Sequence, residues 1–193
     1  LVAMLTDVLD SGAVPLLLHA QTPDTTARRI ADAAGAAMLL TSDASSSLDV
    51  QLLGGALRID TPSLVLGTSG TTGALPKLYV FSLERAVANA RAHLEALGHA
   101  PERILLPVPL SHAFGLVAGP LTARLSGAEL FAFAHAPDPA TLHDALRTHA
   151  IDTVHLTPPL LRLLVKRHAR KPLAPLPHLR LVGVGSAPVT RGE

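Results

Sequence analysis

Short apolar segments alternate with amphipathic segments along almost the whole of this chain. Runs such as 63–66, 103–109 and 153–156 are typical of buried strands, whereas the stretches between them carry apolar residues at helical spacing. Alternation of this kind packs helices against a sheet whose strands run mostly in one direction. The sequence therefore predicts an α/β fold with a largely parallel sheet flanked by helices.

Proline and glycine mark the expected helix boundaries. Thr22-Pro23, Asp138-Pro139 and Thr157-Pro158 each fit an N-cap followed by a first-turn proline, and Gly35 and Gly98 follow expected last turns. The expected strands are 14–18, 37–41, 63–66, 78–81, 103–109, 129–133, 153–156 and 179–184, and the expected helices are 23–34, 83–97, 113–125, 139–149 and 158–170.

Composition describes a globular chain and excludes several classes. Among 193 residues, 48% are hydrophobic and 16% charged, and the formal net charge is +1, so disorder and a general attraction to nucleic acid or anionic membrane are not expected. No apolar run reaches the roughly 18 residues that span a bilayer. The chain has no cysteine, which excludes disulfides and thiolate catalysis and is compatible with a reducing cytoplasm, where we expect the protein.

Histidine and basic residues are numerous, but their patterns do not predict a metal or nucleic-acid site. None of the ten histidines forms a His-Glu-x-x-His pair, so we expect no protein-bound zinc. Several cations lie between residues 162 and 171, near the end of an expected helix, where positive charge complements exposed carbonyl groups. With only 3% aromatic residues, no stacking platform for nucleic acid accompanies them.

The segment Leu64–Lys77 has the character of a phosphate-binding loop. An apolar run opens into a loop in which Gly70 and Gly73 allow backbone N–H groups to turn toward one anion. Lys77 adds a positive charge. The hydroxyl donors of the loop are Thr68, Ser69, Thr71 and Thr72. A polar hairpin turn is the structural alternative, but loops so rich in donors more often carry function.

The spacing argues against the nucleotide-binding P-loop, in which glycine directly precedes the lysine and Ser or Thr follows it. Here Pro76 precedes Lys77 and Leu78 follows it. The segment instead resembles the Thr-Ser-Gly-Thr-Thr-Gly-x-Pro-Lys signature of the adenylate-forming superfamily, which includes acyl-CoA synthetases, aryl-acid ligases, luciferases and peptide-synthetase adenylation domains. Ala74 and Leu75 stand where that signature has one residue, which displaces Lys77 by one position.

Three further segments resemble the same superfamily, in the same order along the chain. Pro109–Gly115 is similar to the segment whose histidine lines the carboxylate pocket, and His112 matches that histidine. Pro158-Pro159 resembles the family's Pro-Pro turn. Leu176–Pro188 is similar to the strand and Gly-Ala-Pro turn beside adenine and the acyl group, with Ser186 where glycine or alanine is usual.

The resemblance implies a reaction in which a carboxylic acid attacks the α-phosphate of ATP, pyrophosphate leaves, and the acyl group passes to the thiol of CoA or of a carrier-protein phosphopantetheine. His112 and Lys77 are the catalytic candidates. The implied binding residues are Thr68, Ser69, Gly70, Thr71, Thr72, Gly73, Gly185, Ser186, Ala187 and Pro188. Mg²⁺ accompanies ATP in this chemistry, and its usual protein ligand lies in a motif beyond Glu193.

The resemblance covers nearly the whole chain but only an interior part of the family's length. We therefore expect residues 1–193 to form one partial domain of the large amino-terminal adenylation domain, without the carboxyl-terminal lid domain, and to be inactive in isolation. The alternatives are a non-catalytic nucleotide- or acid-binding remnant, or half of a split enzyme that needs a partner. A P-loop hydrolase is a third possibility, against which the lysine spacing argues.

Overall fold

The computed structural model describes residues 2–42, 48–67, 75–133 and 135–187. The chain divides into two compact units, Leu1–Arg85 and Ala86–Glu193, which we call unit 1 and unit 2. The expectation of one partial domain over 1–193 stays a prediction, because subdomains and separate domains both give such a division.

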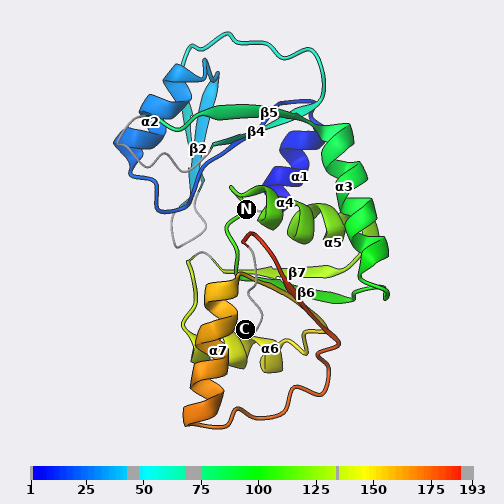
Figure 1. The fold of residues 1–193 in the computed structure, drawn as a ribbon. Helices are drawn as coiled ribbons and strands as arrows, with labels where there is room; N and C mark the ends of the chain where they lie inside the picture. The colour runs from blue at the N-terminus through cyan, green and yellow to red at the C-terminus, as the bar shows by residue number, and fades with distance from the viewer. Residues whose placement is uncertain (1, 43–47, 68–74, 134, 188–193) are drawn as a thin grey trace. The chain divides into compact units, whose positions relative to one another are not determined.

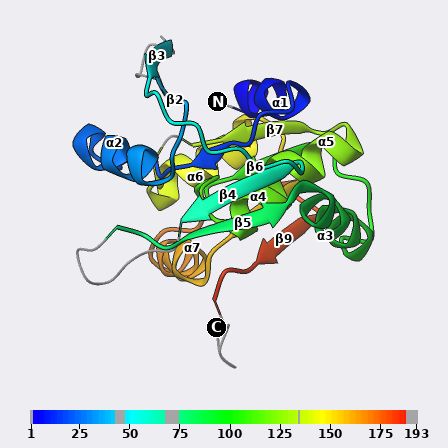
Figure 2. The same cartoon turned by 90° about the horizontal axis from the view of Figure 1, so that it is seen from above.

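The described residues of unit 1 form two small sheets and two helices (Figure 2). Strand β4 pairs in parallel with β1 and antiparallel with β5, and β2 pairs antiparallel with β3. The central strand β4 is buried over its first four residues. The elements are α1 (Val2–Asp10), β1 (Leu16–Leu17), α2 (Asp24–Ala33), β2 (Met38–Ser42), β3 (Leu48–Leu52), β4 (Ser63–Gly67) and β5 (Leu78–Ser82).

Unit 2 is built on a four-stranded parallel sheet with the order β7-β6-β8-β9. Helix α3 (Leu83–Ala96) leads into it from unit 1. The remaining elements are β6 (Arg103–Leu106), α4 (Ala113–Leu116), the π-helical segment η1 (Val117–Leu121), α5 (Thr122–Ser126), β7 (Glu129–Ala132), α6 (Pro139–Thr148), β8 (Thr153–Leu156), α7 (Pro158–Arg170) and β9 (Leu181–Val184).

Helices cover both faces of the unit 2 sheet (Figure 1). On one face α6 and α7 enclose a cluster of fully buried side chains that includes Leu105, Leu142 and Val154. Alternate strand residues point to the other face, where α3, α4, η1 and α5 lie. Both faces of the sheet are therefore packed, as expected for parallel strands with apolar sequences.

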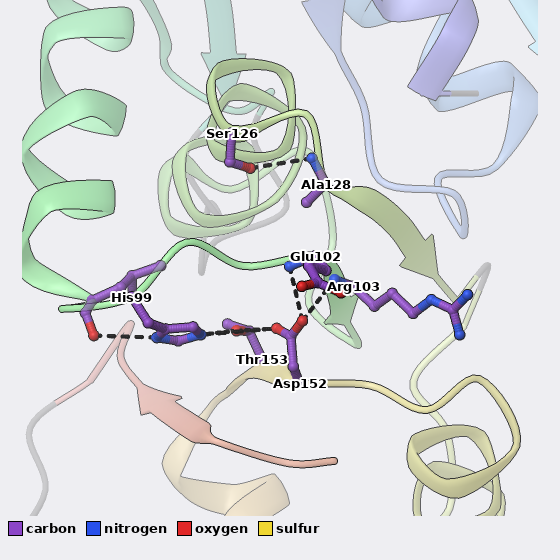
Figure 3. A network of polar contacts seen from close by, with 8 residues as sticks. His99, Glu102, Arg103, Ser126, Ala128, Asp152 and Thr153 are labelled. Atoms are coloured by element: carbon purple, nitrogen blue, oxygen red, sulfur yellow. Dashed lines mark hydrogen bonds and ion pairs between the residues drawn. The ribbon is translucent and has the colours of Figure 1, made fainter.

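A polar network ties the amino ends of β6 and β8 together (Figure 3). One carboxylate oxygen of Asp152 accepts hydrogen bonds from the backbone N–H groups of Glu102 and Arg103, at 2.8 and 3.0 Å. The Thr153 hydroxyl donates to the other oxygen at 2.6 Å, and His99 Nε2 lies 2.9 Å from that hydroxyl. Burial raises the pKa of Asp152, but the hydrogen bonds from Thr153, Glu102 and Arg103 outweigh it and the pKa is lowered.

The expected α/β class is confirmed, and β8 and α7 begin and end where the sequence predicts. The sequence missed α1 and β3. Helix α1 has no acidic residue in its first turn and no basic residue in its last turn to mark its ends, and β3 carries a mixed polar pattern. Pro23, not Thr22, occupies the N-cap of α2, so the expected helix begins one residue later. The single helix expected over 113–125 is interrupted by η1, because Pro120 lacks the N–H that a regular helical turn requires.

The β4–β5 hairpin departs from the parallel pairing that dominates unit 2. Its strands run antiparallel, with Ser63 opposite Ser82 and Gly67 opposite Leu78. Residues 68–77 connect the two strands, and 68–74 of them lie outside the described residues.

Candidate functional site

Three turns that the sequence singles out meet at one edge of the unit 2 sheet. Strands β6, β8 and β9 are parallel, so their carboxyl ends lie at the same edge. The segment 107–112 follows β6, Thr157-Pro158 follows β8, and Gly185–Ala187 follows β9. In open α/β sheets, ligands bind outside the carboxyl ends of the strands.

Gly185 connects the turn after β9 with the end of β8 and with the start of α4. Its N–H donates to the carbonyl of Leu156 at 3.1 Å, which extends the β8–β9 pairing by one residue. A Cβ at position 185 would lie 2.7 Å from the ring of Phe114, so only glycine lets the Phe114 ring pack there. The start of α4 and the turn after β9 are therefore in direct contact.

His112 is the N-cap residue of α4 and is exposed. Its backbone is extended, with φ −104° and ψ 143°, and its carbonyl accepts the N–H of Leu116 at 2.9 Å. The imidazole makes no capping hydrogen bond. His112 therefore lies two residues before Phe114, in the segment that follows β6 at this edge.

Ser186 and Ala187 continue the turn after β9 and are both exposed. Ser186 has a φ of 75°, in the left-handed region that a residue with a Cβ rarely adopts. The preference for a small residue at this turn has a physical basis, because the backbone conformation favours glycine.

A pair of histidines, His155 buried and His93 half-buried, lies behind this edge, and the sequence did not single out the pair. His155 is 0% exposed, its ring centroid is 4.9 Å from that of His93 on α3, and Phe114 packs edge-on against it at 6.0 Å. Neither ring nitrogen of His155, nor Nε2 of His93, has a hydrogen-bond partner among the described residues. A Cβ at position 183 would lie 2.5 Å from His155 Nδ1, so glycine there makes room for the ring.

Burial controls the protonation of both histidines. It lowers the pKa of His155 to about 4, with a smaller contribution from the charge of His93, and it lowers the pKa of His93 as well. Both rings are therefore neutral near pH 7. The strand pattern of β8 predicts that the side chain of His155 points into the protein, but only the position of α3 shows that it lies against His93.

The structure thus brings together four of the expected site residues, namely His112, Gly185, Ser186 and Ala187, in unit 2. Lys77 is exposed and directly precedes β5 in unit 1. The other expected binding residues, Thr68, Ser69, Gly70, Thr71, Thr72, Gly73 and Pro188, lie outside the described residues.

Two structural findings bear on metals and membranes. In the part of the chain that the structure describes, no three His, Asp or Glu side chains gather as metal ligands would. Among the same residues, no helix is both long enough and apolar enough to cross a bilayer.

Turns at the carboxyl edge of a parallel sheet define a ligand-binding α/β domain. The chain belongs to the AMP-binding enzyme family, whose model matches residues 55–192. In a separate comparison, a stretch of 61 residues is 43% identical to Protein Y of Streptomyces griseus and covers 31% of this chain and 20% of that protein.

Several solved structures share the fold. VinN matches with a TM-score of 0.75 at 21% identity, over 98% of this chain and 53% of its own. The o-succinylbenzoate CoA synthetase MenE from Bacillus subtilis, in complex with the acyl-adenylate OSB-AMP, matches with a TM-score of 0.72 at 19% identity, over 97% of this chain and 53% of its own. MbtA of Mycobacterium smegmatis matches with a TM-score of 0.72 at 24% identity, over 96% of this chain and 40% of its own. The chain therefore spans about half the length of the first two.

Proposed function

We propose that this chain is part of an enzyme that activates a carboxylic acid with ATP and passes the acyl group to a thiol. A carboxylate oxygen attacks the α-phosphorus, the bond to the β-phosphate oxygen breaks, and pyrophosphate leaves with those electrons. The thiol of CoA or of a carrier-protein phosphopantetheine then displaces AMP. The absence of cysteine supports a cytoplasmic location.

The observation that carries this proposal is the convergence of His112 and Gly185–Ala187 at the carboxyl edge of a sheet whose chain belongs to the AMP-binding family. In this proposal the exposed backbone of residues 185–187 borders the adenine and the acyl group. The imidazole of His112 orients the carboxylate for attack. Positioning of this kind accounts for much of the catalysis in transfers that need no covalent nucleophile.

In this proposal, groups outside unit 2 bind the phosphates and neutralise their charge. The donors of the 68–73 loop hold the β- and γ-phosphates, and Lys77 neutralises charge on the leaving pyrophosphate. Mg²⁺ bound to the phosphates supplies further charge neutralisation. Among the described residues, Lys77 suits the neutralising role because it is an exposed cation close to the loop in sequence.

The test is acid-dependent exchange of pyrophosphate into ATP over a panel of aliphatic and aromatic acids. We expect exchange by the longer protein that contains this chain, and none by the isolated 193 residues. His112→Ala is expected to reduce kcat/KM for the acid by about tenfold or more, the scale of a positioning group near the reacting atoms. His178→Ala replaces another exposed histidine, which precedes β9 at the opposite edge, and is expected to leave exchange unchanged. Equal losses in both variants would exclude a role for His112.

A second candidate function follows from the length of the chain, which covers only about half of VinN and of MenE. The chain then binds nucleotide or acid without turnover, or acts as one half of a split enzyme. Adding the missing carboxyl-terminal portion as a separate polypeptide distinguishes these. Restored exchange supports the split enzyme, whereas binding of ATP without exchange under complementation supports the non-catalytic remnant.

A further inference from the structure

The His93–His155 pair brings together buried nitrogen atoms that make no hydrogen bonds. Both ring nitrogens of His155 and Nε2 of His93 are shielded from solvent and have no partner among the described residues. The two ring centroids are only 4.9 Å apart. Most buried polar side-chain atoms in proteins are paired, so a cluster of unpaired ones needs a specific explanation.

Burial by itself does not leave a histidine unpaired in unit 2. His143 is only 5% exposed, yet its Nε2 lies 2.9 Å from the carbonyl oxygen of Ala174. Nε2 of His99 likewise lies 2.9 Å from the hydroxyl of Thr153. An aliphatic side chain at position 155 would fill space without the free-energy cost of unpaired polar atoms. Packing therefore does not explain the imidazole of His155.

The pair lies directly inward of the candidate site. His155 is the second-last residue of β8, whose carboxyl end forms part of the site edge. Phe114 is half-buried, packs edge-on against His155 and lies against Gly185. Helices α3 and α4, which carry His93 and Phe114, lie on the same face of the sheet (Figure 1). Phe114 therefore contacts both the turn after β9 and the histidine pair.

The neutral rings favour one kind of bound group. Burial lowers the pKa of both histidines, to about 4 for His155, so they are uncharged near pH 7. A neutral imidazole has one N–H donor and one nitrogen acceptor, and a hydroxyl group can donate to one ring while it accepts from the other. Neutral rings do not balance the charge of a buried carboxylate or ammonium group. The pair therefore suits a hydroxyl group.

We propose that the His93–His155 pair binds a hydroxyl group of the acid substrate, remote from the carboxylate that is activated. The substrate is then a hydroxy acid, with its carboxylate beside His112 and its hydroxyl inward of Phe114. Phe114 changes rotamer to admit the hydroxyl, because its ring contacts His155 in the structure. This assignment rests on the proposed function, since it requires an acid at the carboxyl edge of the unit 2 sheet.

The test compares acids in which a methyl group replaces the hydroxyl. Exchange of pyrophosphate into ATP by the longer protein is measured for 4-hydroxybenzoate against 4-methylbenzoate, 3-hydroxybenzoate against 3-methylbenzoate, 5-hydroxypentanoate against hexanoate, and 7-hydroxyheptanoate against octanoate. We expect at least one hydroxy acid to exceed its methyl counterpart by about tenfold or more in kcat/KM. A site that hydrogen-bonds a hydroxyl discriminates strongly against an analogue without it.

Two variants assign this preference to the pair. His155→Leu and His93→Leu each remove one of the bonding rings, and each is expected to lower the kcat/KM ratio of the preferred pair of acids by about fivefold or more. His143→Leu removes a buried ring that bonds Ala174 instead, and is expected to leave the ratio unchanged. Circular dichroism verifies the fold of each variant. The wild-type ratio and His93→Leu keep the test valid even if His155→Leu does not fold.

The outcomes separate this inference from the function on which it rests. Exchange that favours no hydroxy acid over its methyl counterpart overturns the inference and leaves the proposed function standing. A preference that survives in both folded variants of the pair also overturns it. Exchange with none of the acids in this and the wider panel contradicts the proposed function, and the inference fails with it.

Discussion

At the residue scale, His155 has the least favourable environment described in unit 2. It is fully buried and both ring nitrogens lack partners among the described residues, a situation that costs free energy for each unsatisfied group. The ring is retained beside Phe114 and His93, directly behind the turns of the candidate site. Its titration is therefore linked to the stability of that edge.

We expect the stability of unit 2 to fall as the pH is lowered from about 6.5 to about 4. The pKa of His155 is about 4 in the folded protein against 6.5 for an ordinary histidine, so the unfolded chain binds the proton first. Across this range the contribution of His155 to the free energy of unfolding falls by about 3 kcal/mol. The lowered pKa of His93 acts in the same direction.

The variant His155→Leu tests this assignment. It removes the titrating ring and two unpartnered nitrogens, so urea unfolding is expected to show stability at pH 7 no lower than wild type and a much smaller decrease toward pH 4. His178→Leu changes an exposed histidine and is expected to keep the wild-type pH dependence. An unchanged pH profile in His155→Leu would contradict the assignment.

Ser186 offers a second test at this scale. Because its φ is 75°, Ser186→Gly is expected to stabilise the chain by about 0.5–1 kcal/mol in thermal or urea unfolding. Ser186→Ala keeps the Cβ and serves as the matched control without that gain. If alanine stabilises as much as glycine, strain in the left-handed conformation is not the cause.

At the element scale, the amino ends of β6 and β8 depend on one carboxylate. Asp152 accepts two backbone hydrogen bonds from the start of β6 and one from Thr153, and its side chain is 12% exposed. These groups lie at the edge opposite the candidate site. The network therefore supports the sheet and takes no part in binding at the other edge.

We expect Asp152→Ala to lower the free energy of unfolding by about 2–4 kcal/mol, because two backbone N–H groups and the Thr153 hydroxyl lose their acceptor. Urea unfolding measures the change. Glu95→Ala removes an exposed carboxylate from α3 and is expected to cost far less. A similar small effect of both substitutions would show that the Asp152 network contributes little.

Strand β5 is the outer strand of its sheet among the described residues, and its middle is exposed on both faces. Tyr79, Val80 and Phe81 are 49%, 57% and 43% exposed. Exposed apolar edges promote pairing with another chain. We expect the isolated chain to self-associate, and Val80→Lys to lower its average mass in light scattering. Leu125→Lys, on the helix α5, is the control that should not. Unchanged association in Val80→Lys would exclude the β5 edge.

At the scale of the whole molecule, the two units differ in the size of their sheets and in how the sheets are packed. Unit 2 has a four-stranded sheet with helices on both faces and a cluster of fully buried residues. The described strands of unit 1 form one three-stranded and one two-stranded sheet. Small sheets of this kind are marginal without further packing.

We therefore expect a fragment of residues 83–193 to fold alone, with dispersed amide resonances and a cooperative thermal transition. A fragment of residues 1–82 is expected to show neither, because its described sheets are small. A collapsed 83–193 fragment without dispersed resonances would show that unit 2 needs the first 82 residues to fold.

The sequence by itself determined the class of fold, the boundaries of β8 and α7, the start of α6, and the turns after β6, β8 and β9. Prolines and capping residues act locally, and the apolar alternation of parallel strands is continuous, so these features can be recognised without the partners. The resemblance to adenylate-forming enzymes rested on the segment 64–77 and on the same turns, and membership of the AMP-binding family is confirmed.

Only the tertiary structure decided the rest. The contact of Phe114 with Gly185, the burial of His155 against His93 and the Asp152 network join residues that are distant in sequence. Local pattern does not reveal such pairs, because each depends on how elements pack.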